Sequence, residues 1–302
     1  MPEEAMNSTD HPRVAVIGLG AMGLPMAQRL MMSLDVVAFD LVAECAARAA
    51  AVGVNVAPSV PVAVSGADIV LLAVRTLDQV ETALFGPEGA SASLGRSAIV
   101  VLTSTIGVPG ARHLEERLAA SGIRLVDMPV SGGPARARSG DLLVFVGAAD
   151  EVIDGARSVL DLLASTVTVV GPRPGDGQAL KTVNQLLCGV HIAAAAEALA
   201  LAKGLGLDPQ VALDALGAGA AASFMLSNRG PRIIRAMRGE RPEVLSRTDI
   251  FVKDMGIVTD AGRRAGVALP VAATTEQLYV IGQAAGLGPS DDSEVVTLLG
   301  GS

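Results

Sequence analysis

One lysine and one asparagine stand where an apolar segment could carry acid–base chemistry. Lys181 and Asn184 lie in "GPRPGDGQALKTVNQLL", where a loop rich in glycine and proline runs into a long apolar stretch. Residues three positions apart share one face of a helix. A lysine amine in a dry cleft has a lowered pKa and can remove or return a proton, so Lys181 is a candidate general acid/base. Taken alone, a single helical lysine is more often a solvated surface charge.

A glycine-rich segment near the N-terminus has the spacing of a dinucleotide-binding loop. "VAVIGLGAMG" follows GxGxxG between an apolar run and a helical pattern, which allows a tight turn and the close approach of a pyrophosphate. Asp40 ends the next apolar run about twenty residues later, where an acid binds a ribose 2′-hydroxyl and repels a 2′-phosphate. No arginine follows it directly, so NAD is favoured over NADP; a glycine-rich turn with an incidental aspartate is the alternative. The loop residues assigned to the cofactor are Gly18, Leu19, Gly20, Ala21, Met22 and Gly23.

A second glycine stretch, "DMPVSGGPARARSGDL", could hold an acid group. Ser131, Gly132 and Gly133 present a hydroxyl and closely spaced backbone amides, and such a turn can bind a carboxylate. A tight surface loop explains the same residues equally well. Arg136 and Arg138 could contact an anion, but alternating charges in a loop are more often solvated.

The elements that must position these residues change character along the chain. Up to Gly171, near-continuous apolar runs alternate with helical patterns, which predicts a largely parallel sheet in a doubly wound α/β domain. From residue 177 to 205 the chain is almost all helix formers, a predicted helix of roughly 40 Å at about 1.5 Å per residue. More helical segments follow without convincing strands. We therefore predict a disordered tail over 1–12, a Rossmann-type NAD-binding domain over 13–173 and an all-α domain over 174–302, joined by the long helix.

Composition excludes several function classes. The chain has 302 residues, a net charge of −8, two cysteines and three histidines. An acidic chain argues against nucleic acid or an anionic membrane as partner, and so few potential ligands argue against a metal site. No run reads as a membrane span and the acidic N-terminus is no signal peptide, so we expect a cytoplasmic protein. The long apolar helix would need partners on several sides, which favours a homodimer or homotetramer.

Four stretches in order resemble the β-hydroxyacid dehydrogenase family, which includes 3-hydroxyisobutyrate dehydrogenase. Together they span nearly the whole chain, which is more specific than the glycine loop alone. They are "GLGAMGLPMA", "DMPVSGGPARARSGDL", "GDGQALKTVNQ" and "FVKDMGIV".

The resemblance implies hydride transfer between nicotinamide and a short hydroxy acid. Lys181 matches the family's catalytic lysine, and Lys253 matches a lysine that closes over the cofactor. The positions matching the substrate contacts are Ser131, Gly132, Gly133, Asn184 and Thr105. The positions matching further cofactor contacts are Val74, Arg75, Gln79 and Thr105. Leu102, Arg75 and Met128 depart from the usual acid, proline and alanine, which affects contacts on the nicotinamide side.

The C-terminal stretches resemble the acid-sugar branch of the family, that of L-threonate dehydrogenase. This implies a four-carbon acid such as L-threonate as substrate. Asn228 and Arg229, in "FMLSNRGPRI", could then contact the polar end of that acid, or only bridge helices. The alternatives are 3-hydroxyisobutyrate dehydrogenase, 2-hydroxy-3-oxopropionate (tartronate semialdehyde) reductase and a non-catalytic NAD-binding scaffold. The scaffold reading is weakened by the lysine, which such relatives should lack.

Overall fold

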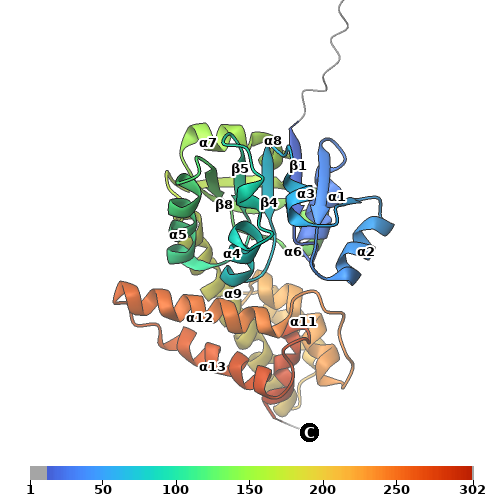
Figure 1. The fold of residues 1–302 in the computed structure, drawn as a ribbon. Helices are drawn as coiled ribbons and strands as arrows, with labels where there is room; N and C mark the ends of the chain where they lie inside the picture. Colours follow the sequence, from blue (N-terminus) through green and yellow to red (C-terminus); the bar gives the residue numbers. More distant parts are fainter. Residues whose placement is uncertain (1–11, 301–302) are drawn as a thin grey trace, which may run out of the picture. The chain divides into compact units, whose positions relative to one another are not determined.

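The computed structural model describes residues 12–300, which form two compact units divided between Ala179 and Leu180 (Figure 1). The domain limits expected from the sequence stay a prediction. The tail expected over residues 1–12 lies, except for Pro12, outside the described residues.

The first unit is built on a sheet whose order is β3-β2-β1-β4-β5-β6-β8-β7, with β9 paired to β8. The strands are β1 Arg13–Ile17, β2 Asp35–Phe39, β3 Asn55–Val56, β4 Ile69–Leu72, β5 Ile99–Leu102, β6 Arg124–Asp127, β7 Val130–Ser131, β8 Leu142–Gly147 and β9 Ala164–Gly171. The strands from β3 to β6 pair in parallel, so the predicted doubly wound arrangement is confirmed. This order is that of a Rossmann-type domain.

Helices cover both faces of this sheet (Figure 1). They are α1 Gly23–Leu30, α2 Ala43–Ala51, α3 Val60–Val64, α4 Leu77–Phe85, α5 Gly107–Ala119, α6 Gly133–Ser139, α7 Asp150–Gly155 and α8 Arg157–Leu163, with the short η1 Ala90–Ala92. The apolar run of β1 is continuous because both faces of this strand are covered. Val14 and Val16 pack into a core with α1 and α8, whereas Ala15 and Ile17 pack into a second core with α3, α4 and α5.

The far edge of the sheet departs from the parallel pattern. The strand β8 pairs antiparallel with β6 and β7, and parallel with β9. Residues 132–141 connect β7 to β8, and this connection is shorter than the dozen or so residues that a parallel crossover needs. The chain therefore returns antiparallel.

The second unit is helical, as predicted. It holds most of α9 Asp176–Gly204, then α10 Pro209–Gly217, α11 Phe224–Met237, α12 Thr248–Ala265, α13 Pro270–Ala284 and the 3-10 helix η2 Asp292–Leu298. No strand occurs between residues 180 and 300. Its core contains the fully buried Tyr279, which stacks on Phe251 and donates a 2.9 Å hydrogen bond to the carbonyl of Gly189.

Among residues 12–300, α9 is the one helix long and apolar enough to cross a membrane by length and composition. Core helices of soluble proteins pass the same test. Ile192, Ala196 and Leu199 of α9 are fully buried in the helical core.

Candidate active site

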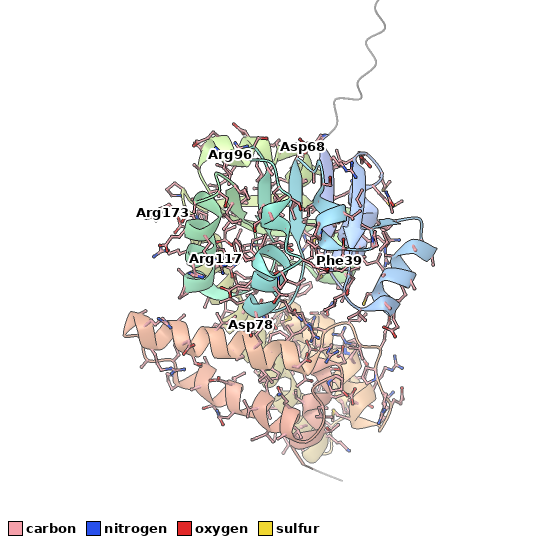
Figure 2. All side chains as sticks on the ribbon, in the orientation of Figure 1. Phe39, Asp68, Asp78, Arg96, Arg117 and Arg173 are labelled. Carbon is pink, nitrogen blue, oxygen red and sulfur yellow. The ribbon has the colours of Figure 1, made fainter. Side chains whose placement is uncertain are left out.

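The carboxyl ends of five strands lie in one row in the first unit. Register pairs Ile17 with Phe39 and with Leu72, Leu72 with Leu102, and Leu102 with Asp127. Figure 2 shows this edge at Phe39 and Asp78, away from Asp68 and Arg96, which precede β4 and β5. Ligands of doubly wound sheets bind at this edge. The segments that begin there carry the glycine loop, Asp40, the residues 73–79, and Thr105.

The glycine loop is shaped for a dinucleotide. Gly18 has φ +98°, and a Cβ there would lie 2.8 Å from the carbonyl oxygen of Ala73. A Cβ on Gly23 would overlap the carbonyl of Gly18, so α1 packs closely only on a glycine. A Cβ on Gly20 would meet nothing within 4 Å, and no side chain caps the start of α1. Open space beside uncapped helix amides fits a pyrophosphate.

Asp40 lies beside this loop at the end of β2. Its carboxylate accepts hydrogen bonds from the backbone N–H of Leu19, at 2.6 Å, and of Val42, at 2.8 Å. The acid is therefore fixed next to the phosphate loop, where a ribose would be bound. Leu41, the next residue in the chain, is 88% exposed and uncharged, so this position offers no positive charge to a 2′-phosphate.

The loop after β4 carries the other cofactor candidates. The side-chain Oε1 of Gln79 accepts hydrogen bonds from the backbone N–H of Arg75 and of Thr76. In return, the backbone N–H of Gln79 donates to the Thr76 hydroxyl. This capping box begins α4 and gives Gln79 a structural role in addition to any contact with a cofactor. Val74 is half-buried, and Arg75 is exposed.

The turn of Ser131, Gly132 and Gly133 connects β7 to α6. Gly132 and Gly133 have φ of +138° and +78°, and a Cβ on Gly133 would meet nothing within 4 Å. The free space beside Gly133 leaves room for a small anion next to this turn. The Nε of Arg136 donates a 2.9 Å hydrogen bond to the carboxylate of Asp141, so this arginine already has an acid as its partner. Arg138 is exposed.

Lys181 lies on α9 with its side chain buried, at 7% exposure. Burial lowers the pKa of its amine, while the charge of Asp254 opposes this effect and that of Lys253 adds to it. A buried amine with a lowered pKa suits proton transfer near neutral pH better than a solvated surface lysine. The structure thus excludes the reading of Lys181 as an exposed charge.

Asn184 is half-buried one turn further along α9. Its Nδ2 donates hydrogen bonds to the Gln185 side chain, at 2.9 Å, and to the sulfur of Cys188, at 3.4 Å. Cys188 is packed on the helical core, and its burial raises the thiol pKa. Cys188 is thus no ready nucleophile.

Asp254 lies in "FVKDMGIV", and the sequence alone did not single it out as a site residue. Its buried carboxylate accepts hydrogen bonds from the Gln185 side chain and, at 2.7 Å, from the Nζ of Lys253. The helix α12 therefore brings one acid and one lysine into electrostatic range of Lys181. The signal in the sequence that could have indicated Asp254 is its position directly after Lys253, in a stretch that resembles the family's K-D-x-G segment.

Arg229 is held by an acid of its own unit. Its guanidinium makes a two-point contact with the buried carboxylate of Asp292, at 3.2 and 2.9 Å, and a 2.7 Å hydrogen bond to Asn228. Arg232 donates a single hydrogen bond from its Nε to Asp291 Oδ1, at 2.9 Å. This network bridges α11 to η2, which favours the structural interpretation of Asn228 and Arg229.

Residues 12–300 contain no group of three or more His, Cys, Asp or Glu that could hold a metal ion. The candidates fall into two sets. One unit carries the glycine loop, Asp40, residues 74–79, Thr105 and the serine–glycine turn, and the other carries Lys181, Asn184 and Lys253.

Comparison with known proteins identifies the class. The NAD binding domain of 6-phosphogluconate dehydrogenase matches residues 13–171, and the NAD-binding region of NADP-dependent 3-hydroxyisobutyrate dehydrogenase matches residues 175–299. The chain therefore belongs to the β-hydroxyacid dehydrogenase family related to 3-hydroxyisobutyrate dehydrogenase. It is a nicotinamide-dependent oxidoreductase that acts on the CH–OH group of a hydroxy acid.

Individual relatives agree with this class. An L-threonate dehydrogenase of Cupriavidus necator is 39% identical, over 95% of this chain and 96% of its own. One of Pectobacterium atrosepticum is 34% identical, over 98% and 97%. A crystal structure described as 3-hydroxyisobutyrate dehydrogenase from Salmonella typhimurium superposes with a TM-score of 0.88 at 33% identity, covering 95% of this chain and 99% of that one.

Proposed function

We propose that the protein is an NAD-dependent dehydrogenase of a four-carbon acid sugar such as L-threonate, with Lys181 as the general acid/base. The observation that carries the proposal is the buried Lys181, whose amine has a lowered pKa within the family's lysine motif. The relatives named L-threonate dehydrogenase, which match nearly end to end, support the substrate class.

The cofactor supplies a hydride acceptor at nicotinamide. The loop from Gly18 to Gly23 would hold its pyrophosphate, with Gly20 leaving the room for it, and Asp40 would bind its ribose. The preference for NAD rests on Asp40, whose charge repels a 2′-phosphate. Further contacts are assigned to Leu19, Ala21, Met22, Val74, Arg75, Gln79, Thr105 and Lys253.

The protein's own residues bind the acid and move the proton. Ser131, Gly132 and Gly133 bind the substrate carboxylate through the serine hydroxyl and backbone amides. Asn184 and Thr105 orient the hydroxyl-bearing carbon. When the alcohol is oxidised, the neutral Nζ of Lys181 would take the hydroxyl proton while bound nicotinamide would accept the hydride from carbon, which leaves a carbonyl. In the reverse direction the protonated amine of Lys181 returns that proton.

Two further expectations accompany this function. The cytoplasm is the proposed location, because the substrate and cofactor are those of soluble metabolism. A homodimer or homotetramer is the proposed assembly, because Val183, Leu187 and Leu201 leave an exposed apolar stripe on α9.

The test is a panel of hydroxy acids with NAD and with NADP, followed by the absorbance of the reduced cofactor. The panel contains L-threonate, D-erythronate, glycerate and 3-hydroxyisobutyrate, and 2-hydroxy-3-oxopropionate is tested with reduced cofactor. We expect the highest kcat/KM for L-threonate with NAD. A higher value for 3-hydroxyisobutyrate or 2-hydroxy-3-oxopropionate would instead assign the corresponding alternative, and a preference for NADP would overturn the role given to Asp40.

A further inference from the structure

A buried hydrogen-bond network joins three segments of the first unit at the carboxyl edge of the sheet. Its members are Asp127, at the end of β6, and Gln178, in the first turn of α9, and both side chains are fully buried. Asp127 Oδ2 accepts from the backbone N–H of Gly175 and of Gln178, each at 2.9 Å. Asp127 Oδ1 accepts from Gln178 Nε2 at 2.8 Å. The first turn of α9 is thus tied to the end of β6.

The other contacts of Gln178 reach the segment that carries Thr105. Its Oε1 accepts from the backbone N–H of Ile106, at 2.9 Å, and of Gly107, at 3.0 Å, and its Nε2 also donates to the carbonyl of Ser104, at 3.0 Å. No side chain of α5 caps that helix, which begins at Gly107. Gln178 therefore satisfies amides that a helix start would otherwise leave unpaired.

The orientation of the Gln178 amide is fixed by these partners. Its oxygen faces two N–H donors, whereas its nitrogen faces a carboxylate and a carbonyl, so a rotated amide would oppose like groups. Close approach is required as well. A Cβ on Gly177 would lie 2.5 Å from the carbonyl of Phe145 and 3.0 Å from Asp127 Oδ2. The network is therefore tightly specified, and an unpaired group within it would be costly.

We propose that Gln178 and Asp127 are positioning residues for the redox step, because they lock the Thr105 segment to the first turn of the helix that carries Lys181. This inference rests on the proposed function of Lys181 and Thr105. Lys181 follows Gln178 by three residues on α9, so a displaced first turn moves the amine. Neither positioning residue touches a reacting atom. Misplacement by about 1 Å can cost hydride transfer up to about a hundredfold, while leaving NAD binding nearly unchanged.

A reciprocal exchange of the two side chains tests the lock. In Gln178→Glu a carboxylate oxygen replaces Nε2 and faces both Asp127 and the Ser104 carbonyl. In Asp127→Asn an amide nitrogen faces either Nε2 of Gln178 or two backbone donors. The double variant Asp127→Asn/Gln178→Glu restores one hydrogen bond with donor and acceptor exchanged, and it keeps the net charge of wild type.

We expect each single variant to lose kcat about tenfold or more, with a primary deuterium isotope effect above that of wild type and an NAD Kd changed less than about threefold. We expect the double variant to recover at least about half of the lost kcat on a logarithmic scale. The matched control is Thr103→Val, which removes the 2.7 Å hydrogen bond of the same segment to the Leu72 carbonyl and should keep kcat. If the single variants lower Tm but keep kcat and the isotope effect, the network only stabilises the fold and the proposal is overturned.

Hydrogen exchange gives a readout that needs no substrate. We expect Asp127→Asn and Gln178→Met, measured on the full chain, to speed amide exchange at Ile106 and Gly107 and in residues 176–181 together. Exchange that changes in only one of the two segments would overturn the lock. If wild type oxidises none of the acids in the panel, the proposed function fails, whereas the exchange result still decides whether the segments are coupled.

Discussion

At the scale of single residues, the protonation state of Lys181 governs the direction of proton transfer. Its neutral amine is the base in oxidation, and its protonated amine is the acid in reduction. Burial lowers the pKa of this amine from the usual 10.5.

The pH dependence of kcat follows from that shift. Oxidation should accelerate as pH rises through the pKa of Lys181, with a midpoint below 10.5, and reduction should slow over the same range. Stopped-flow measurement of the hydride-transfer rate from pH 6 to 11 checks this. A rate of oxidation independent of pH, or a midpoint at or above 10.5, would contradict the assignment.

From the sequence alone, Lys181 could be named as a candidate general acid/base, but whether its side chain is buried or lies on the surface could not be predicted. That choice depends on burial and on the neighbouring Asp254, which lies more than seventy positions away in the chain and is brought near by α12. Gln178 was missed for a similar reason. A glutamine has no distinctive chemistry until its partners Asp127 and Ile106 are known.

At the scale of elements, the turn between β1 and α1 separates packing from ligand binding. A Cβ on Gly23 would overlap the Gly18 carbonyl, whereas a Cβ on Gly20 would meet nothing within 4 Å, and Gly20 does not have a positive φ. Replacing Gly23 should therefore affect the stability of the fold, whereas replacing Gly20 should affect the binding of the cofactor.

We expect Gly23→Ala to lower the free energy of unfolding by about 1–3 kcal/mol, since α1 must move away from β1. Gly20→Ala should keep wild-type stability but weaken NAD binding about tenfold or more, because its methyl group would stand where the pyrophosphate approaches. Urea denaturation and calorimetric titration measure the two effects. A Gly20→Ala variant that binds NAD normally, or a Gly23→Ala variant of wild-type stability, would contradict this division.

Most elements could be predicted from the sequence because their apolar patterns are long. The run before the glycine loop and the helix from Asp176 to Gly204 are examples. The strands β3 and β7 have two residues each, too few for any periodicity. The antiparallel return of β8 depends on the length of the connection from β7, which the apolar patterns do not reveal.

At the scale of the whole molecule, one buried acid links stability to pH. Burial raises the pKa of Asp127 to about 6 from 3.8, although hydrogen bonds from Gln178 and Gly175 favour its ionised form. A raised pKa in the folded state means that the native protein binds more protons than the unfolded chain between these values. Its stabilising contribution is thus present below pH 3.8 and is lost as pH rises through about 6.

The free energy of unfolding of wild type, relative to that of Asp127→Asn, should fall by about 3 kcal/mol between pH 3 and pH 8, at about 1.36 kcal/mol per pKa unit. Equilibrium denaturation of both proteins at several pH values measures this difference. Asp176 is the nearby acid whose charge adds to the shift, so Asp176→Asn should shrink it. A difference that does not vary with pH would show that Asp127 titrates as an ordinary acid.

The central claim is that the buried amine of Lys181 moves the substrate proton. Its most direct measurement is the turnover of Lys181→Ala, with Lys181→Met as the uncharged variant closest in shape, alongside the Kd for NAD. We predict that turnover with the best substrate falls below detection in both variants while the Kd for NAD stays within about threefold of wild type, because proton transfer and cofactor binding depend on different residues. Either variant retaining more than about a tenth of the wild-type rate would contradict the account, since general acid–base catalysis is worth about a hundredfold or more.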